Sequence, residues 1–152
     1  MRTRSRAQVL VAIALAVMVA AGASAAVKYY APIKGATYKG TLKIARASSV
    51  TFPISFKVSA NGKGVSTFKF SNGYPVYCQG GGFGQLQPAS GSISKGKFSV
   101  KLPIYFAPGH AHQGFVIVTG RFGKNKTESG AVRTAFTHAT VCNGTSTYTT
   151  KG

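Results

Sequence analysis

Three histidines are the side chains of this sequence best suited to metal chemistry. His110 and His112 stand two residues apart in "PGHAHQG", and an extended segment would place both rings on one face. Two imidazoles in this arrangement can bind zinc or copper, and His138 is a candidate third ligand. The alternative is an exposed loop with two solvated rings, because nothing in the sequence brings His138 close and no carboxylate is available to orient the rings.

The near absence of acidic residues excludes most hydrolytic chemistry. Asp and Glu together number 1, and that residue, Glu128, stands in "GKNKTESG", a predicted turn. One carboxylate cannot form the acid pair of most glycoside hydrolases or the usual ligand set of calcium or of a phosphoryl-transfer metal. A Ser-His-Asp triad would need Glu128 as its acid. We therefore expect a protein that is not an enzyme and has no cofactor.

Basic residues dominate the charge of the chain. Lys and Arg number 19, which gives a formal net charge of +18. Such a charge attracts polyanions, and the candidate anion-binding residues are five lysines on the polar faces of predicted strands or beside a predicted turn: Lys57, Lys69, Lys101, Lys95 and Lys97. The alternative is that scattered lysines only keep a β-rich protein soluble and protect its edges.

Two tyrosines share the sequence parity of the polar residues in their predicted strands. Tyr77 and Tyr105 would then face outward, where an aromatic ring can stack on a sugar or a base. No DNA- or RNA-binding motif is present, so sequence-specific nucleic-acid binding is not expected.

The N-terminus has the layout of a secretory signal peptide. Three arginines precede an uncharged apolar run from Val9 to Ala21 and the small residues "AGASAA". We expect cleavage after Ala25, no transmembrane span after cleavage, and export to the cell envelope or the extracellular space. An uncleaved membrane anchor is the alternative, because the uncharged stretch continues to Ala26.

Export also explains the two cysteines of the chain. Outside the cytoplasm, two cysteines in a small domain usually pair, so a disulfide between Cys78 and Cys142 is predicted. A free or intermolecular thiol is the alternative. A zinc site at these cysteines is not expected, because no histidines stand near them at zinc-finger spacing.

Period-two alternation predicts the fold class. "FPISFKV" and "VSTFKF" alternate on either side of Asn61-Gly62, which indicates a β-hairpin, and further strands are expected in "YPVYC", "GKFSVKLPIYF", "GFVIVTGRF", "AVRTAFTH" and "TVCNGTSTYTT". Seven or eight such strands without an amphipathic helix predict an all-β antiparallel β-sandwich of jelly-roll or Ig-like type, with a small closed β-barrel as the alternative. The expected organisation is a signal peptide over 1–25, an N-terminal extension over 26–37 and one β-sandwich domain over 38–152.

Several motifs carry a resemblance to a known family. They are "TYKGTL", "ISFKVSANGKGVSTFKF", the run from Cys78 to Gly81, "ISKGKFSV", "VTGRF", "ESGAVR" and "CNGTSTYTT". Together they resemble a family of small secreted β-sandwich domains that is common in actinobacteria. The resemblance implies a sandwich fold and a bridge between Cys78 and Cys142, but no chemistry. This chain differs in having Tyr148 where such domains usually close with a tryptophan.

These observations favour a secreted, non-catalytic basic domain that associates with anionic polymers of the cell envelope or the extracellular matrix. One alternative is a metal-binding protein that uses His110 and His112. The other is a purely structural secreted domain.

Overall fold

The computed structural model describes residues 28–43, 51–70, 85–105, 112–137 and 143–152. These residues form strands and one short 3-10 turn: β1 (Thr37–Lys43), β2 (Thr51–Val58), β3 (Gly64–Phe70), β4 (Gln85–Leu86), β5 (Gly91–Ser94), β6 (Lys97–Tyr105), β7 (His112–Phe122), η1 (Lys124–Lys126), β8 (Thr127–Phe136) and β9 (Gly144–Lys151). The predicted all-β class is confirmed.

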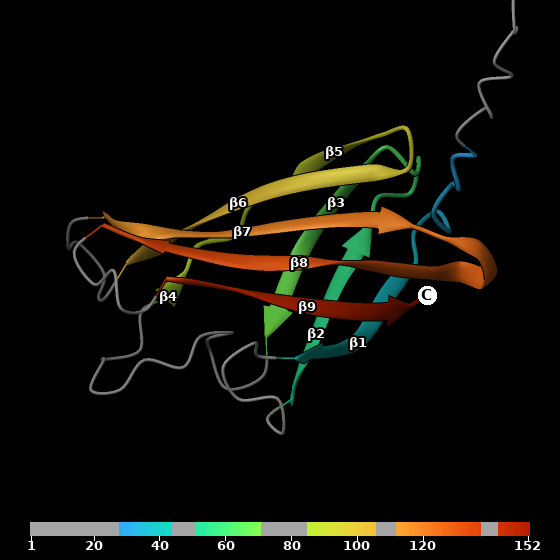
Figure 1. Cartoon of the computed structure of the whole chain (residues 1–152). Helices are drawn as coiled ribbons and strands as arrows, with labels where there is room; N and C mark the ends of the chain where they lie inside the picture. Colours follow the sequence, from blue (N-terminus) through green and yellow to red (C-terminus); the bar gives the residue numbers. More distant parts are fainter. Residues whose placement is uncertain (1–27, 44–50, 71–84, 106–111, 138–142) are drawn as a thin grey trace, which may run out of the picture.

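The sheet closes into a barrel. Its antiparallel strands follow the order β6-β5-β3-β2-β1-β9-β8-β7, and β7 pairs with β6 to complete the ring, while the two-residue β4 adds to the far end of β6. In Figure 1, β6 to β9 form one wall, and β1 to β3 cross behind it at a steep angle. The structure thus takes the small closed barrel, the predicted alternative to two separate sheets, because β6 pairs along both of its edges.

Along the strands, side chains alternate between the inside and the outside of the barrel, and the inward ones fill its interior. In β6, for example, every second residue from Phe98 to Ile104 is buried and the residues between them face outward. Aromatic rings occupy the centre of the core, where Phe56 stacks on Tyr38 with centroids 5.3 Å apart and also contacts Phe98 and Phe122. Truncating a ring of this kind to alanine typically costs about 3–5 kcal/mol.

The predicted hairpin is confirmed as β2 and β3. Asn61 Oδ1 accepts hydrogen bonds from Ser59 Oγ at 2.6 Å and from the backbone N–H of Lys63 at 2.9 Å, and Gly62 takes a φ of 75°. The side chain of Asn61 therefore organises the turn, and Gly62 supplies the left-handed residue that the turn needs.

The turn before β8 is shorter than the sequence suggests. Only Lys124–Lys126 form the 3-10 turn, and Asn125 and Lys126 have positive φ angles of 55° and 60°. The strand begins at Thr127, so placing Glu128 in the turn was wrong. Because β8 pairs with β7 and β9 from its first residues, Glu128 joins the alternation and points into the barrel.

Residues before β1 also contribute to the packing. Tyr30 and Ala36 lie against the core, and the backbone N–H of Ile33 donates to the hydroxyl of Tyr38 at 3.1 Å. The expected signal peptide over 1–25 and the expected strand in "YPVYC" lie outside the described residues.

Candidate functional site

The only acidic side chain of the sequence is buried inside the barrel. Glu128 is 1% exposed, and two hydroxyl groups donate hydrogen bonds to its carboxylate: Tyr148 to Oε1 at 2.8 Å and Thr150 to Oε2 at 2.7 Å. Burial raises the pKa of Glu128 from 4.5 to about 7, although both hydrogen bonds oppose the shift. Near neutral pH the carboxyl group is therefore divided between its neutral and its charged form.

The hydroxyl group of Tyr148 connects three neighbouring strands. Tyr148 lies on β9, and its hydroxyl is 2.8 Å from Glu128 Oε1 on β8 and 3.1 Å from the carbonyl oxygen of Thr119 on β7. A phenol has one proton to donate, so it serves one of these acceptors at a time. Burial, followed by the charge of Glu128, raises the pKa of Tyr148, so this proton stays on the phenol.

Two facing glycines make room for this cluster. Gly120 on β7 pairs with Gly130 on β8, and Gly130 pairs in turn with Tyr148. A methyl group at Gly120 would collide with Glu128 Oε1 and the ring of Phe98, and one at Gly130 would collide with the carbonyl oxygen of Thr119. The cluster is thus built into the barrel wall, and Glu128 is too deeply buried to act on an external substrate.

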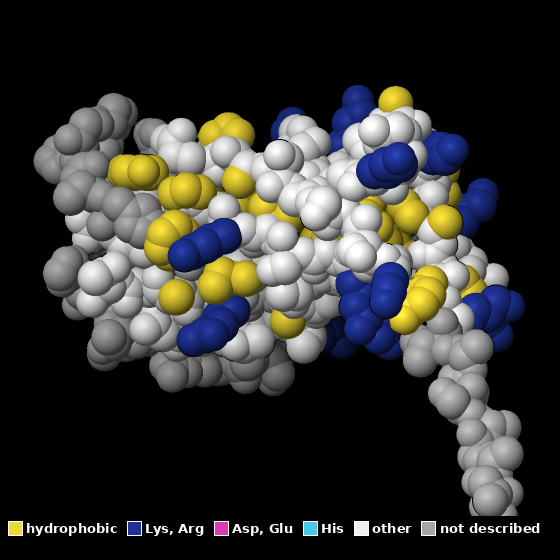
Figure 2. Space-filling model, turned by 90° about the horizontal axis from the view of Figure 1, so that it is seen from above, with side chains coloured by type: hydrophobic (Ala, Val, Ile, Leu, Met, Phe, Trp, Pro, Cys, Tyr) yellow, Lys and Arg dark blue, Asp and Glu magenta, His cyan; other side chains and the backbone are white. Residues whose placement is uncertain are grey.

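Burial of Glu128 leaves the outer surface without an acidic side chain, because Glu128 is the only acidic residue of the sequence. Figure 2 accordingly shows dark blue Lys and Arg side chains at both ends of the upper face and no magenta side chain on it. The described outer surface presents cations with no acidic side chain to neutralise them.

A depression of about 730 Å³ lies in this surface over β5 to β8. Five exposed hydroxyl side chains line it: Ser92, Ser94, Ser99, Thr119 and Ser129. Two cations also line it, Lys97 on β6 and Arg121 on β7, which are directly opposed in the strand register. The arrangement of paired cations among hydroxyl groups suits an oxyanion attached to a polar ligand.

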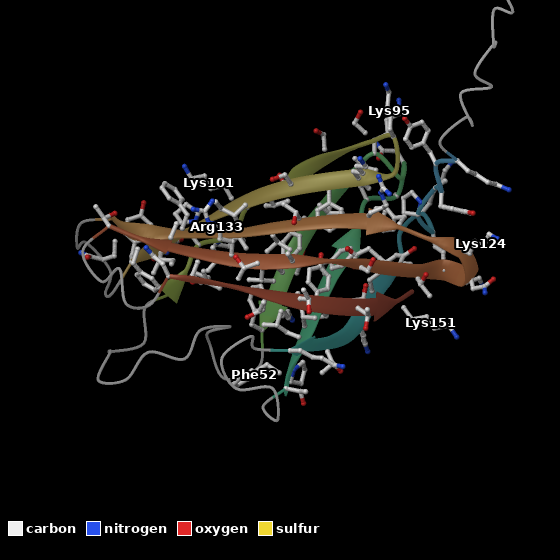
Figure 3. All side chains as sticks on the ribbon, viewed as in Figure 1. Phe52, Lys95, Lys101, Lys124, Arg133 and Lys151 are labelled. Carbon is white, nitrogen blue, oxygen red and sulfur yellow. The ribbon has the colours of Figure 1, made fainter. Side chains whose placement is uncertain are left out.

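The structure does not bring the five predicted lysines into one surface. Lys97 lines the depression, and Lys95 stands beside it in the turn between β5 and β6. Lys57 and Lys69 are exposed on β2 and β3, which form the opposite part of the barrel. Lys101 lies at the middle of β6, and Figure 3 shows it apart from Lys95.

Lys101 is distinguished by an aromatic partner. Its Nζ atom lies 3.5 Å from the centre of the Phe115 ring on the neighbouring strand β7. A cation held over a ring face gains from the ring quadrupole. This contact engages Lys101 at a place away from the depression, close to Arg133 (Figure 3).

Of the two predicted aromatic residues, Tyr105 is half-buried at the last position of β6. Tyr77 lies outside the described residues, and the same holds for His110, His138, Cys78 and Cys142. His112 is the first residue of β7, and its side chain is not described. Within the described part of the chain, no three His, Cys, Asp or Glu residues gather to hold a metal ion. The metal site and the disulfide stay predictions from the sequence.

The buried position of Glu128 and the role of Arg121 were not predicted from the sequence. Glu128 could have been found by continuing the inward alternation of Phe136, Thr134 and Val132 back towards the start of β8. Arg121 stands at an outward position of "GFVIVTGRF", but its approach to Lys97 depends on the pairing of β6 with β7, which no local pattern shows.

No protein-family model, curated protein or solved structure matches the chain. The resemblance to small secreted β-sandwich domains therefore stays a prediction from the quoted motifs. In the described residues, none of the helical structure is long and apolar enough to span a membrane.

Proposed function

We propose that this protein is a secreted, non-catalytic binding protein that associates with anionic polymers of the cell envelope or the extracellular space. The observation that supports this most strongly is the burial of Glu128, which leaves the described outer surface with basic side chains and no acidic one. The export of the protein rests on the signal-like N-terminal sequence.

The cations of this surface repel one another in the free protein. Lys97 faces Arg121 across β6 and β7, and Lys39 faces Lys151 across β1 and β9. Like charges directly opposite in a sheet are destabilising, and no acidic side chain at the surface offsets them. A polyanion would relieve this repulsion and release its own counterions, which makes the association favourable and sensitive to salt.

Binding titrations across salt test the proposal. The full-length chain is titrated with polygalacturonate, poly(glycerol phosphate) and DNA, and with neutral dextran as the control. We expect saturable binding to at least one polyanion that weakens about tenfold or more between about 50 and 200 mM salt. Binding that is equal on dextran, or that does not change with salt, would contradict the proposal.

A further inference from the structure

The depression over β5 to β8 continues across the next two strands. A second depression of about 440 Å³ adjoins it and shares Ser129 and Gly130 of β8 with it. Its other lining residues come from β9 and β1 and include Thr147, Thr149 and Lys43. The two hollows therefore form one path that runs across the strands of the barrel wall.

Strand register shows how regular this path is. In the first row, the directly paired residues on β6, β7, β8, β9 and β1 are Lys97, Arg121, Ser129, Thr149 and Thr41. In the second row they are Ser99, Thr119, Ala131, Thr147 and Lys43. We call these two rows the hydroxyl band. With about 4.8 Å between neighbouring strands, the band extends for roughly 19 Å.

The composition of the band indicates the chemistry of its ligand. Its middle holds small Ser, Thr and Ala side chains, and its cations stand only towards the ends, with Lys97 and Arg121 at one and Lys43 at the other. Hydroxyl groups both donate and accept, so they match the hydroxyls of a sugar or polyol backbone. Neither row contains an aromatic side chain on which a base could stack.

We propose that the hydroxyl band binds a segment of a hydroxyl-rich polymer that carries spaced oxyanions, such as an acidic glycan or a polyol phosphate. Arg121 and Lys97 hold one oxyanion, Lys43 holds another, and the hydroxyls of the middle bind the backbone between them. This inference rests on the proposed function and names its site and its ligand class.

Arg121 and Lys97 are suited to share one oxyanion. A guanidinium group presents a planar fork of donors that fits two oxygens of a carboxylate or a phosphate, while an ammonium group adds a mobile point charge. Since the two are directly opposed, an oxyanion between them also removes their mutual repulsion.

Two charge variants of equal net change test the position of the site. Lys97→Gln with Arg121→Gln alters the band, and Lys57→Gln with Lys69→Gln removes the same charge from β2 and β3. Binding of poly(glycerol phosphate) and polygalacturonate is measured for each in the full-length chain. We expect the band variant to lose about tenfold or more in affinity and the control to lose about threefold or less. All four side chains are exposed, so the variants are expected to fold, which a melting curve verifies.

A second pair of variants tests the hydroxyl groups without changing the charge. Thr147→Val with Thr149→Val lies in the band, and Thr37→Val with Thr145→Val replaces outward threonines of β1 and β9 outside it. We expect the band variant to lose about threefold to tenfold in affinity for the polymer that binds more tightly, and the control to stay close to the unaltered chain.

The outcomes separate this inference from the proposed function. Equal losses from the two charge variants would mean diffuse binding, which overturns the hydroxyl band but leaves polyanion binding standing. Absence of salt-sensitive binding by the unaltered chain would overturn both. DNA bound more tightly than either polymer would overturn the ligand class. Band-dependent binding of either polymer supports the inference, and the tighter of the two identifies the oxyanion as phosphate or carboxylate.

Discussion

The hydroxyl of Tyr148 stands between two acceptors, Glu128 Oε1 at 2.8 Å and the carbonyl oxygen of Thr119 at 3.1 Å. The charge on Glu128 determines which of these two acceptors receives the hydrogen bond of the Tyr148 hydroxyl. An ionised carboxylate accepts a hydrogen bond from the Tyr148 hydroxyl, whereas a neutral carboxyl group can donate to the phenol oxygen and leave the Tyr148 hydroxyl to donate to the carbonyl oxygen of Thr119. Protonation of Glu128 therefore selects between two hydrogen-bond patterns within the wall formed by β7, β8 and β9.

Glu128 is expected to make the stability of the fold dependent on pH. Its pKa in the folded protein, about 7, lies above its ordinary value of 4.5, so the folded state binds this proton more tightly. The stabilisation is complete below pH 4.5 and is lost as the pH rises through 7, and at about 1.4 kcal/mol per pKa unit the loss is about 3 kcal/mol. Urea unfolding at a series of pH values measures it.

Glu128→Gln is the variant that isolates this contribution. An amide cannot ionise, so the free energy of unfolding should vary less with pH than in the unaltered chain. The rest of the sequence is identical in the two proteins, so the difference between their pH dependences reports on Glu128. If the two proteins showed the same pH dependence, Glu128 would not titrate in this range.

Thr150 is expected to lower the pKa of Glu128. Its hydroxyl donates to Oε2 at 2.7 Å and favours the charged form, so Thr150→Val should raise the pKa further and destabilise the fold by about 1–3 kcal/mol above neutral pH. Because the chain has a single acidic side chain, carbon NMR of the Glu128 carboxyl group can follow its titration without ambiguity.

The matched control is Thr150→Ser, which keeps a hydroxyl group and should leave the pKa of Glu128 close to its original value. An equal rise of the pKa in both variants would show that the hydroxyl group of Thr150 does not lower the pKa of Glu128, because Thr150→Ser keeps that hydroxyl group.

Gly130 is expected to tolerate no side chain. A Cβ atom there would collide with the carbonyl oxygen of Thr119, a backbone atom that cannot move away cheaply, and would lie 2.8 Å from the hydroxyl of Tyr148. We expect Gly130→Ala to cost about 3 kcal/mol or more, or to prevent folding. Gly144→Ala is the control, since nothing lies within 4 Å of a Cβ atom at that position. Similar melting temperatures for the two variants would contradict the packing around Tyr148.

Local sequence patterns predicted much of the fold. The hairpin around Asn61-Gly62 and the alternation of β6 depend on residues close together in the chain, so period two and turn chemistry were enough to find them. Closure into a barrel depends on contacts such as β9 with β1, which join distant parts of the chain. No local pattern distinguishes such a closed ring from two packed sheets.

The site was harder to predict for the same reason. The lysines could be placed on the polar faces of strands, but which of them become neighbours is fixed by strand order and register. Lys97 faces Arg121 only because β6 pairs with β7, and Thr149 joins them through β8 and β9. Glu128 was assigned to a turn because the short polar segment around it has the composition of a turn. Its burial follows from long-range strand pairing that begins at Thr127.

Repulsion between Lys39 and Lys151 is expected to limit the stability of the barrel seam. These residues are directly opposed on β1 and β9, the pair of strands that joins the two ends of the described chain. Lys39→Glu replaces a like pair with an opposite pair and should stabilise the fold by about 0.5 kcal/mol at low salt. The gain should disappear near 1 M salt, where the screening length falls to about 3 Å.

Lys57→Glu makes the same change in net charge opposite Thr37 and Ser66, so it should gain less. Equal gains in urea unfolding would mean that the total charge of the barrel, and not this pair, sets the repulsion.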